Sequence, residues 1–308
     1  MTVASSGRPA DAGALAAALL TRCAFPPPGS EVDCAVSGGA DSLAMLVLAV
    51  AAGCRATAVH VDHALRTGSA EEAAVVERAA RAVGTRFLTV RAPVPEGPNL
   101  EARARAVRRA ALPAGALTGH TADDQAETVI LNLVRGGGLD GLAGIAPGPT
   151  KPILRLRRAD TRAVCAAEGL EPVVDESNAD PSYRRNRIRH ELLPLLDDIA
   201  RRDVAAVVAR QAELIRGDVE LLDELAAGID PTDGRSLSAA PAALARRAVR
   251  RWLRAAGGEE AHPPDAATVE RVLDVARHEA LATDVGGGWR VARTGGRLRL
   301  VPPGSGGE

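Results

Sequence analysis

Residues 34–43 (Cys-Ala-Val-Ser-Gly-Gly-Ala-Asp-Ser-Leu) combine residue types that can bind a phosphate chain. A predicted strand runs into Ser37, Gly38 and Gly39, and a helix is predicted from about residue 41 to residue 52. Glycine lets the backbone adopt a positive φ and approach an anion, and the first N–H groups of a helix lack partners within the helix. The segment therefore predicts a phosphate-binding loop, although such turns can also serve packing alone.

The acidic residue in this loop narrows its chemistry. Asp41 is unfavourable beside an anion unless a cation lies between them, so it is predicted to contact Mg²⁺ or a ribose, with helix capping as the alternative. The Walker A ending and the dinucleotide fingerprint are both missing from the sequence. The string resembles the PP-loop of ATP pyrophosphatases. That resemblance assigns ATP binding to Ser37, Gly38, Gly39, Ala40, Asp41 and Ser42, with Asp41 as the metal ligand.

A second informative string spans residues 118–128 (Thr-Gly-His-Thr-Ala-Asp-Asp-Gln-Ala-Glu-Thr). Thr121 and Asp124 are three residues apart, as in a variant of the capping box, so a helix is predicted to begin here. Three glycines follow Arg135 and predict the end of that helix.

Acidic residues gather in the first turns of this predicted helix. Asp123 and Glu127 are four residues apart and share a face, and Asp124 lies between them in the sequence. Together with His120 they predict a site for a cation, which is Mg²⁺, an ammonium group or both. A capped and solvated helix start is the alternative.

These motifs need a scaffold that brings them together. Helices at about residues 41–52, 71–83 and 100–112 alternate with predicted strands at residues 32–36, 55–62, 86–91 and 116–118. This alternation predicts a parallel sheet of βαβ units with ligands at the carboxyl ends of its strands. Both motifs follow a strand and should therefore lie at that edge.

Two histidines at the end of the second predicted strand could suggest zinc. His60 and His63 flank Asp62, but alternate residues of a strand point to opposite faces, so the two imidazoles would point apart unless the strand ends between them. The sequence therefore disfavours a zinc site here.

The amino-acid composition limits the classes of protein to which this chain can belong. The length of 308 residues predicts about two domains. The net charge of −1 gives no indication of a nucleic-acid partner. Aromatic residues make up only 2% of the chain, which argues against a stacking platform for single strands. The apolar stretch at residues 14–20 is too short to cross a bilayer. The four cysteines show no Cys-x-x-Cys spacing and predict free thiols in a reducing cytoplasm.

The order of the motifs resembles that of tRNA(Ile)-lysidine synthetases over about residues 30–200. Beyond the two strings above, the resemblance rests on residues 60–66 (His-Val-Asp-His-Ala-Leu-Arg), 101–105 (Glu-Ala-Arg-Ala-Arg), 132–136 (Asn-Leu-Val-Arg-Gly), 175–178 (Asp-Glu-Ser-Asn) and 183–189 (Tyr-Arg-Arg-Asn-Arg-Ile-Arg). One departure is Arg109, which follows Arg108 where the family usually has an aromatic residue.

This resemblance implies an α/β fold, with a Rossmann-like parallel sheet of the PP-loop ATPase type and a smaller, mainly helical C-terminal domain. It also implies that ATP with Mg²⁺ adenylates the 2-carbonyl oxygen of the wobble cytidine in the CAU anticodon of tRNA(Ile), and that the ε-amine of free L-lysine then displaces AMP. The product, lysidine, pairs with A and changes the identity of the tRNA from methionine to isoleucine. A homodimer is compatible with the family.

The resemblance also suggests roles for individual residues. We expect Asp123, Asp124 and Glu127 to hold the lysine amine and accept its proton, and His120 to orient or polarise the adenylated base. Arginine suits phosphate contact. RNA or substrate contacts are expected from Arg105, Arg135, Asn186, Arg187 and Arg189. A solvated basic surface is the alternative for the arginines.

The character of the chain changes beyond about residue 200. We expect an adenylating domain at residues 1–205 and a helical tRNA-binding domain at residues 206–308 that ends in a short hairpin around Gly295. A predicted helix at residues 240–256 places several arginines along one side, which suggests RNA binding or plain solvation. These arginines are Arg246, Arg247, Arg250, Arg251 and Arg254.

Three other functions share parts of this pattern. A PP-loop enzyme that thiolates tRNA would need paired cysteines, which the sequence lacks. An amide-forming PP-loop ligase would bind a small acid and ignore RNA. A non-enzymatic nucleotide-binding module would leave the acidic cluster at residues 123–127 without a purpose.

Overall fold

The computed structural model describes residues 10–62, 69–95, 97, 100–173, 180–257 and 264–302. The chain divides into two compact units, residues 1–213 and 214–308. The division lies inside the long helix α10 (Val204–Ala227), and the expected boundary between residues 205 and 206 falls in the same helix. Motif residues 63–66 and 175–178 lie outside the described residues.

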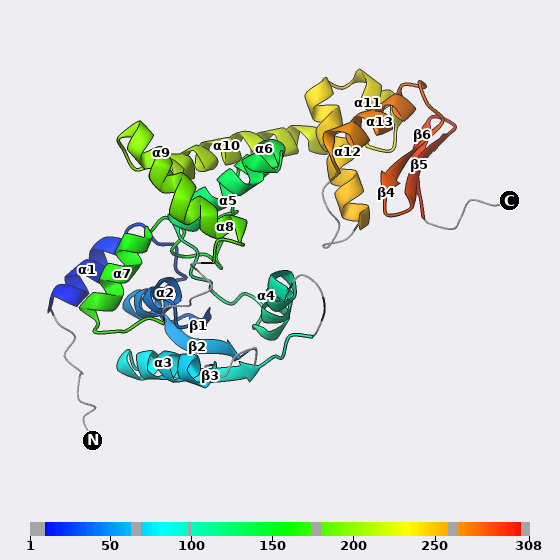
Figure 1. The fold of residues 1–308 in the computed structure, drawn as a ribbon. Helices are drawn as coiled ribbons and strands as arrows, with labels where there is room; N and C mark the ends of the chain where they lie inside the picture. The colour runs from blue at the N-terminus through cyan, green and yellow to red at the C-terminus, as the bar shows by residue number, and fades with distance from the viewer. Residues whose placement is uncertain are drawn as a thin grey trace. The chain divides into compact units, whose positions relative to one another are not determined.

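The first unit is built on a parallel sheet with the strand order β1-β2-β3 (Figure 1). The strands are β1 (Glu31–Ala35), β2 (Arg55–Asp62) and β3 (Arg86–Arg91). Its helices are α1 (Ala10–Leu20), α2 (Ala40–Ala51), α3 (Ser69–Ala82), α4 (Leu100–Ala111), α5 (Ala122–Val134), α6 (Gly138–Leu142), α7 (Arg158–Ala167), α8 (Arg184–Arg187), the π-helical turn η2 (Ile188–Leu192) and α9 (Leu193–Ala200). The α/β fold predicted from the sequence is confirmed.

Helix α2 forms the centre of the core of this unit. Its residues from Ser42 to Ala49 are all buried, in keeping with a helix that is apolar on every side. It contacts β1, β2, α1, α3 and α7, and Figure 1 shows α1 and α7 side by side. The loop at residues 37–39 lies between β1 and the buried helix α2, so the predicted phosphate site is held between the parallel sheet and the core.

The strand predicted at residues 116–118 is reduced to a single parallel bridge between Leu117 and Cys34. Leu117 donates to the Asp33 carbonyl at 2.7 Å and accepts from the Ala35 N–H at 2.9 Å. The next residue, Thr118, donates instead to the Thr150 carbonyl at 2.8 Å, so the ladder stops. The single bridge still brings Gly119 and His120 to the carboxyl edge of the sheet.

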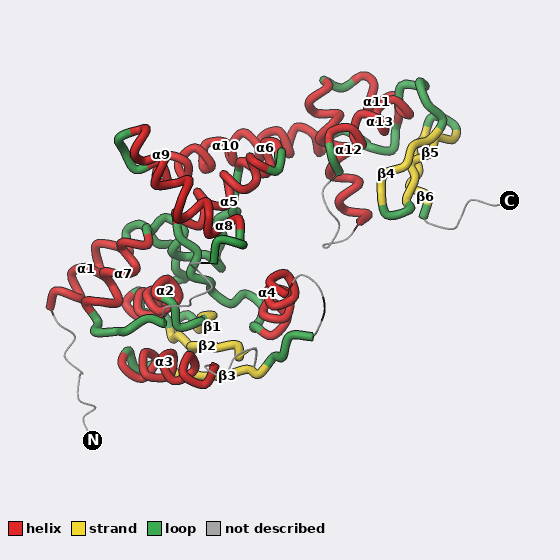
Figure 2. The backbone as a smooth tube through the Cα atoms, viewed as in Figure 1, coloured by secondary structure: helices red, strands yellow, loops and turns green. Residues whose placement is uncertain are grey.

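The second unit combines helices with an antiparallel sheet of strand order β4-β5-β6 (Figure 2). The expected hairpin is present as β5 and β6, and β4 is an added strand that the sequence reading missed. The elements after α10 are α11 (Gly234–Ala239), α12 (Ala242–Gly257), α13 (Ala266–Ala276), β4 (Ala282–Gly286), β5 (Trp289–Thr294) and β6 (Arg297–Val301). In the described parts of both units, no helix has the length and apolar character needed to cross a membrane.

The four cysteines are free thiols, as the sequence predicts. Burial raises the pKa of Cys34 to about 12 and the pKa values of Cys23 and Cys165 to about 11. A thiol with a pKa of about 11 is ionised to only about one part in a thousand at pH 8, and the thiolate is the reactive form.

We therefore expect these three thiols to react slowly with a thiol reagent at pH 8 in the native protein, and quickly after unfolding in urea. Mass spectrometry of the labelled peptides measures each site separately. Fast native labelling of Cys34 would contradict the burial described here.

Candidate functional site

The loop at residues 37–39 has the backbone conformation that a phosphate cradle requires. Gly38 has a φ of +84°, which a side chain would strain. The Ser42 hydroxyl accepts from the Ser37 N–H at 3.1 Å and donates to the Gly39 carbonyl at 2.9 Å, so the loop is closed upon the first turn of α2. No described side chain caps the N-terminus of α2 at Gly39, which leaves its first amides oriented toward a ligand.

The two sequence motifs meet at Gly119. A Cβ atom built on Gly119 would lie 2.8 Å from the Asp41 carbonyl oxygen and 2.9 Å from the Ser42 nitrogen. The segment that carries His120 can therefore lie this close to the phosphate loop only if residue 119 has no side chain.

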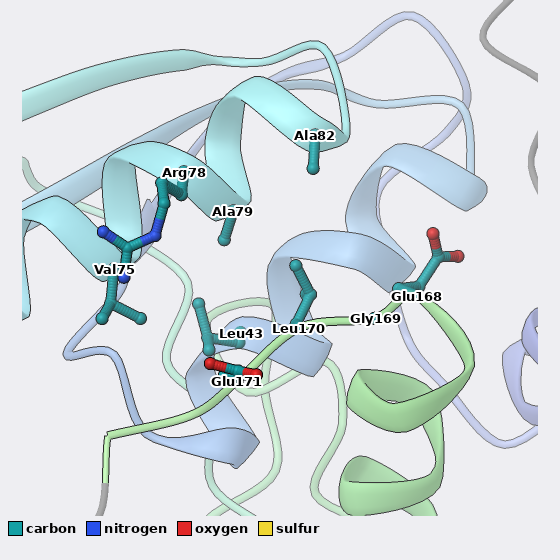
Figure 3. A pocket seen from close by; sticks show the side chains of 9 residues that line it. All are labelled: Leu43, Val75, Arg78, Ala79, Ala82, Glu168, Gly169, Leu170 and Glu171. Atoms are coloured by element: carbon teal, nitrogen blue, oxygen red, sulfur yellow. The ribbon is translucent and has the colours of Figure 1, made fainter.

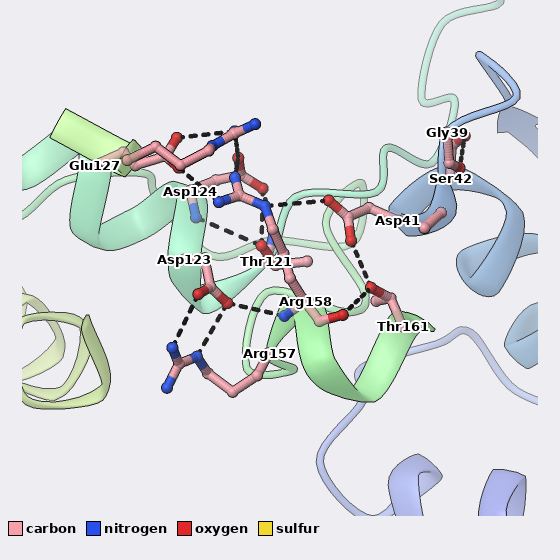
Figure 4. A network of polar contacts seen from close by, with 12 residues as sticks. Gly39, Asp41, Ser42, Thr121, Asp123, Asp124, Glu127, Arg157, Arg158 and Thr161 are labelled. Atoms are coloured by element: carbon pink, nitrogen blue, oxygen red, sulfur yellow. Dashed lines mark hydrogen bonds and ion pairs between the residues drawn. The ribbon is translucent and has the colours of Figure 1, made fainter. Parts of the chain in front are cut away.

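Asp41 extends from the first turn of α2 toward the start of α7 (Figure 4). Its Oδ1 accepts from the Thr161 hydroxyl at 2.5 Å, and its Oδ2 lies 3.5 Å from Nε of Arg158. Burial raises the pKa of Asp41; the Thr161 hydrogen bond opposes this, nearby Asp124 adds to it, and Arg158 and Arg189 lower it. This carboxylate is thus held by one hydroxyl and one more distant ion pair, with oxygen lone pairs to spare.

Helix α5 begins with the capping box that the sequence predicts. Asp124 Oδ2 accepts from both the backbone N–H and the hydroxyl of Thr121 at 2.9 Å, and the Thr121 hydroxyl accepts from the Asp124 N–H at 3.4 Å. Asp124 Oδ1 accepts from Arg158 Nη2 at 2.5 Å. Burial alone would raise the pKa of Asp124, but Arg158 and the Thr121 hydrogen bonds outweigh it and lower the pKa.

The carboxylate of Asp123 accepts three hydrogen bonds from residues at the start of α7. It receives a bidentate pair from Arg157 Nε and Nη2, both at 2.9 Å, and a hydrogen bond from the Arg158 N–H at 2.8 Å. Burial opposes ionisation, yet Arg157 and the Arg158 amide outweigh it and lower the pKa of Asp123. Arg157 also pairs with Asp203, so this carboxylate belongs to a network that ties α5 to α7.

Glu127 is fully buried and surrounded by arginines. Its Oε1 accepts from Arg158 Nη1 at 2.6 Å and from Arg189 Nε at 2.7 Å. Its Oε2 accepts from Arg185 Nε at 3.0 Å and from Arg189 Nη2 at 3.2 Å. The predicted grouping of acidic residues at this helix start is thus present, and in this structure the cations are supplied by the chain itself.

The sequence analysis missed four partners of these carboxylates, namely Arg157, Arg158, Thr161 and Arg185. One feature of the sequence could have revealed Arg157 and Arg158. Positive charges at a helix N-terminus oppose the helix macrodipole, so a pair of arginines at the start of α7 requires nearby carboxylates. The sequence could not show that Arg185, unlike its neighbours in the same run of arginines, pairs with a buried carboxylate.

The residues predicted to contact RNA do not form one group. Arg189 faces Glu127, and Asn186 is buried and donates to the Asp180 carbonyl at 2.9 Å. Arg187 is exposed and pairs with Glu191 at 2.9 Å. Arg135 is exposed at the C-cap of α5. The Arg105 side chain lies outside the described part of the structure.

Two histidines lie near the phosphate loop. His120 Nδ1 is 3.0 Å from the Thr118 hydroxyl, which itself donates to the Thr150 carbonyl at 3.0 Å, so Nδ1 is the donor in this pair. His60 is buried, and its Nδ1 is 2.9 Å from the Val36 carbonyl, directly before the loop. His63 lies outside the described residues, so the disfavoured zinc interpretation stays untested.

A separate cavity of about 210 Å³ lies between α2, α3 and the end of α7 (Figure 3). Leu43, Ala79 and Leu170 form apolar walls, and Arg78 and Glu171 provide charge. Leu43 is the one lining residue that belongs to either motif, and none of residues 37–42 and 118–128 lines the cavity, so we do not assign it to the site.

The contact at Gly119 gives a direct test of how the two motifs are joined. In Gly119→Ala the new methyl group must push the backbone of Asp41 and Ser42, and overpacking of this kind costs about 1–3 kcal/mol. We expect a lower free energy of unfolding in urea and weaker ATP binding by calorimetry. Gly148→Ala is the matched control, because its Cβ would meet no atom within 4 Å. Equal behaviour of the two variants would contradict the close approach.

Comparison with known proteins agrees with this geometry. Residues 16–196 match the PP-loop domain family, and residues 235–299 match the TilS substrate binding domain. In fold alone, this chain is similar to the solved structure of the U34-tRNA thiolase NcsA from Methanococcus maripaludis with its [4Fe-4S] cluster. The TM-score is 0.54 and the identity 17%, over 67% of this chain and 78% of the other.

Relatives named tRNA(Ile)-lysidine synthase are similar over most of their length. The protein from Nocardia farcinica is 40% identical over 90% of this chain and 93% of its own. Those from Rhodococcus erythropolis and Mycobacterium leprae are each 42% identical, over 75% and 71% of this chain and over 76% and 73% of theirs. This chain belongs to the tRNA(Ile)-lysidine synthase family.

Proposed function

We propose that this protein forms lysidine on tRNA(Ile). ATP adenylates the 2-carbonyl oxygen of the wobble cytidine in the CAU anticodon and releases pyrophosphate. The ε-amine of free L-lysine then attacks C2, and the C–O bond to AMP breaks. The modified base pairs with A, so the codon read by the tRNA changes from AUG to AUA.

The observation that carries this proposal is that Arg158 connects Asp41, next to the phosphate loop, with the acidic start of α5. Arg158 lies 3.5 Å from Asp41 on one side and 2.5 Å from Asp124 on the other. A nucleotide at the loop and an amine at the acidic residues would thus be neighbours, as an adenylation followed by attack of an amine requires.

We assign the ATP half of the reaction to residues 37–42. The loop amides and the start of α2 would bind the phosphates and stabilise the charge that develops on pyrophosphate. Asp41 fits a metal ligand because the contacts it makes leave oxygen lone pairs free, and Mg²⁺ is commonly held by one carboxylate together with phosphates. Bound Mg²⁺ would supply further charge neutralisation.

We assign the lysine half to the carboxylates of α5. The amine must lose a proton before it attacks, and a carboxylate can accept that proton. Asp124 keeps 16% of its side chain exposed whereas Glu127 keeps none, so we propose that Asp124 meets the amine and that Glu127 positions the arginines. Asp123 would position α7 through Arg157, and His120 would orient the base.

The second unit is proposed to bind the tRNA. Helix α12 carries its buried residues Ala245, Val249 and Leu253 on one side, against α13. Its arginines also make contacts within this unit: Arg246 pairs with Glu270, Arg247 pairs with Asp223, and Arg251 donates to the Asp223 carbonyl at 2.8 Å. We further propose that Arg105, Arg135, Asn186, Arg187 and Arg189 contact the substrate or the RNA. A cytoplasmic location and, as the family suggests, a homodimer are also proposed.

Thiolation of tRNA is the main competing function for a PP-loop protein. It is disfavoured because its chemistry relies on paired cysteines, whereas the four cysteines of this chain show no Cys-x-x-Cys spacing. An amide ligase would not require RNA for the release of pyrophosphate, so RNA dependence separates it from our proposal.

The proposed activity can be measured directly. Purified protein, Mg-ATP, radiolabelled lysine and an unmodified tRNA(Ile) transcript with the CAU anticodon should give label in the RNA that requires ATP. The label should disappear when the wobble C is replaced. Pyrophosphate release with tRNA but without label would point to another nucleophile, and silence in both assays would favour the amide ligases.

Asp41→Asn tests the metal assignment. Loss of the carboxylate should reduce tRNA-dependent pyrophosphate release and lysine incorporation together, each by about 100-fold or more. Asp198→Asn is the control, because that exposed carboxylate pairs only with Arg201 at the surface among the contacts seen here. Normal turnover in Asp41→Asn would refute the assignment.

A further inference from the structure

Among the described residues, Arg158 is the side chain that forms ion pairs with carboxylates of both halves of the proposed site. Its Nε lies 3.5 Å from Asp41 Oδ2, its Nη2 lies 2.5 Å from Asp124 Oδ1, and its Nη1 lies 2.6 Å from Glu127 Oε1. Only 15% of the side chain is exposed. Figure 4 shows it between the phosphate loop and α5.

The charges in this cluster balance without any substrate. Asp123 is neutralised by its pair with Arg157, and the other carboxylates, those of Asp41, Asp124 and Glu127, carry three negative charges. The guanidinium groups of Arg158, Arg185 and Arg189 carry three positive charges. An incoming ammonium group would therefore meet a neutral cluster, and placing an extra cation in a partly buried site is unfavourable. Lysine can bind well here only if one of the three guanidinium groups withdraws.

The contacts single out Arg158 as the group that can withdraw. Arg185 also bonds to the Thr128 hydroxyl at 2.7 Å, and Arg189 donates to both oxygens of Glu127. These two belong to the anchoring of α8 and η2 on α5. Arg158 instead extends toward Asp41 in the first turn of α2, beside the loop where phosphates would carry a new negative charge.

We propose that Arg158 is a positioning residue that occupies the ammonium site at Asp124 until nucleotide phosphates draw its guanidinium toward the loop. This inference rests on the proposed function, because it assumes that lysine is the second substrate. It explains how ATP would be bound before lysine: the nucleotide removes the internal cation that competes with the lysine amine. By linkage, lysine must then tighten nucleotide binding by the same factor.

The test is calorimetric titration of lysine into the protein, with and without Mg²⁺ and a non-hydrolysable α,β-methylene analogue of ATP. In the parent chain the analogue should lower the Kd of lysine by about tenfold or more. In Arg158→Gln the competing cation is absent, so lysine should bind without nucleotide about as tightly as with it. Arg155→Gln is the matched control. Arg155 is an exposed arginine of the same segment, it pairs with Glu213, and its variant should keep the parent ratio.

Norleucine lacks the ε-amine of lysine. Its binding distinguishes competition between two cations from a nucleotide effect that would tighten the binding of any ligand of this shape. Its binding should not depend on the nucleotide, because its side chain has no ammonium group to compete with Arg158. A structural role for Arg158 would weaken lysine binding in Arg158→Gln under both conditions and leave the nucleotide effect in place, and that result would overturn the inference.

Arg158→Lys covers the case in which the glutamine variant does not fold, since it keeps the charge. A single ammonium cannot bridge all three carboxylates, so the effect of the nucleotide on lysine binding should fall below that of the parent. An unchanged ratio would overturn the inference. Lysine binding by the parent chain that ignores the nucleotide would overturn it too, whereas no lysine binding under any condition would count against the proposed function itself.

Discussion

The buried carboxylate of Glu127 is the constraint on which the catalytic edge depends. A fully buried charge is tolerated only when it is paired and hydrogen-bonded, and Glu127 receives guanidinium groups from three arginines. These come from α7 on one side and from α8 and η2 on the other, 31 to 62 residues away in the chain. One carboxylate thereby fixes three helical segments around the start of α5.

The same network determines how the phosphate loop is set. Asp41 is held by Thr161 and Arg158, both in the first turns of α7, while Gly119 allows the segment before α5 to lie against the backbone of Asp41. The loop therefore does not depend on β1 and α2 alone. Its first helical turn is connected through Thr161 and Arg158 of α7 to the acidic residues of α5.

Local pattern was enough for most of the fold. The strands at residues 55–62 and 86–91 were predicted at their observed bounds, and the capping box at Thr121 marked the start of α5. The strand at 116–118 was wrong as a full strand, because Thr118 bonds to Thr150 from a distant loop instead of continuing the ladder. In the second unit β4 was missed, since its five residues carry no clear alternation.

The sequence by itself determined the α/β class, the phosphate loop, the acidic helix start and the family they resemble, because each depends on residues close together in the chain. Only the tertiary structure decided what those residues contact. Helical periodicity turned Arg185 and Arg189 inward to Glu127 and left Arg187 at the surface with Glu191, although all three stand in one basic run. Arg158 could not be recognised as a site residue from the sequence, because the carboxylates it bridges lie on α2 and α5, which are far apart in the chain and are brought together only by the fold.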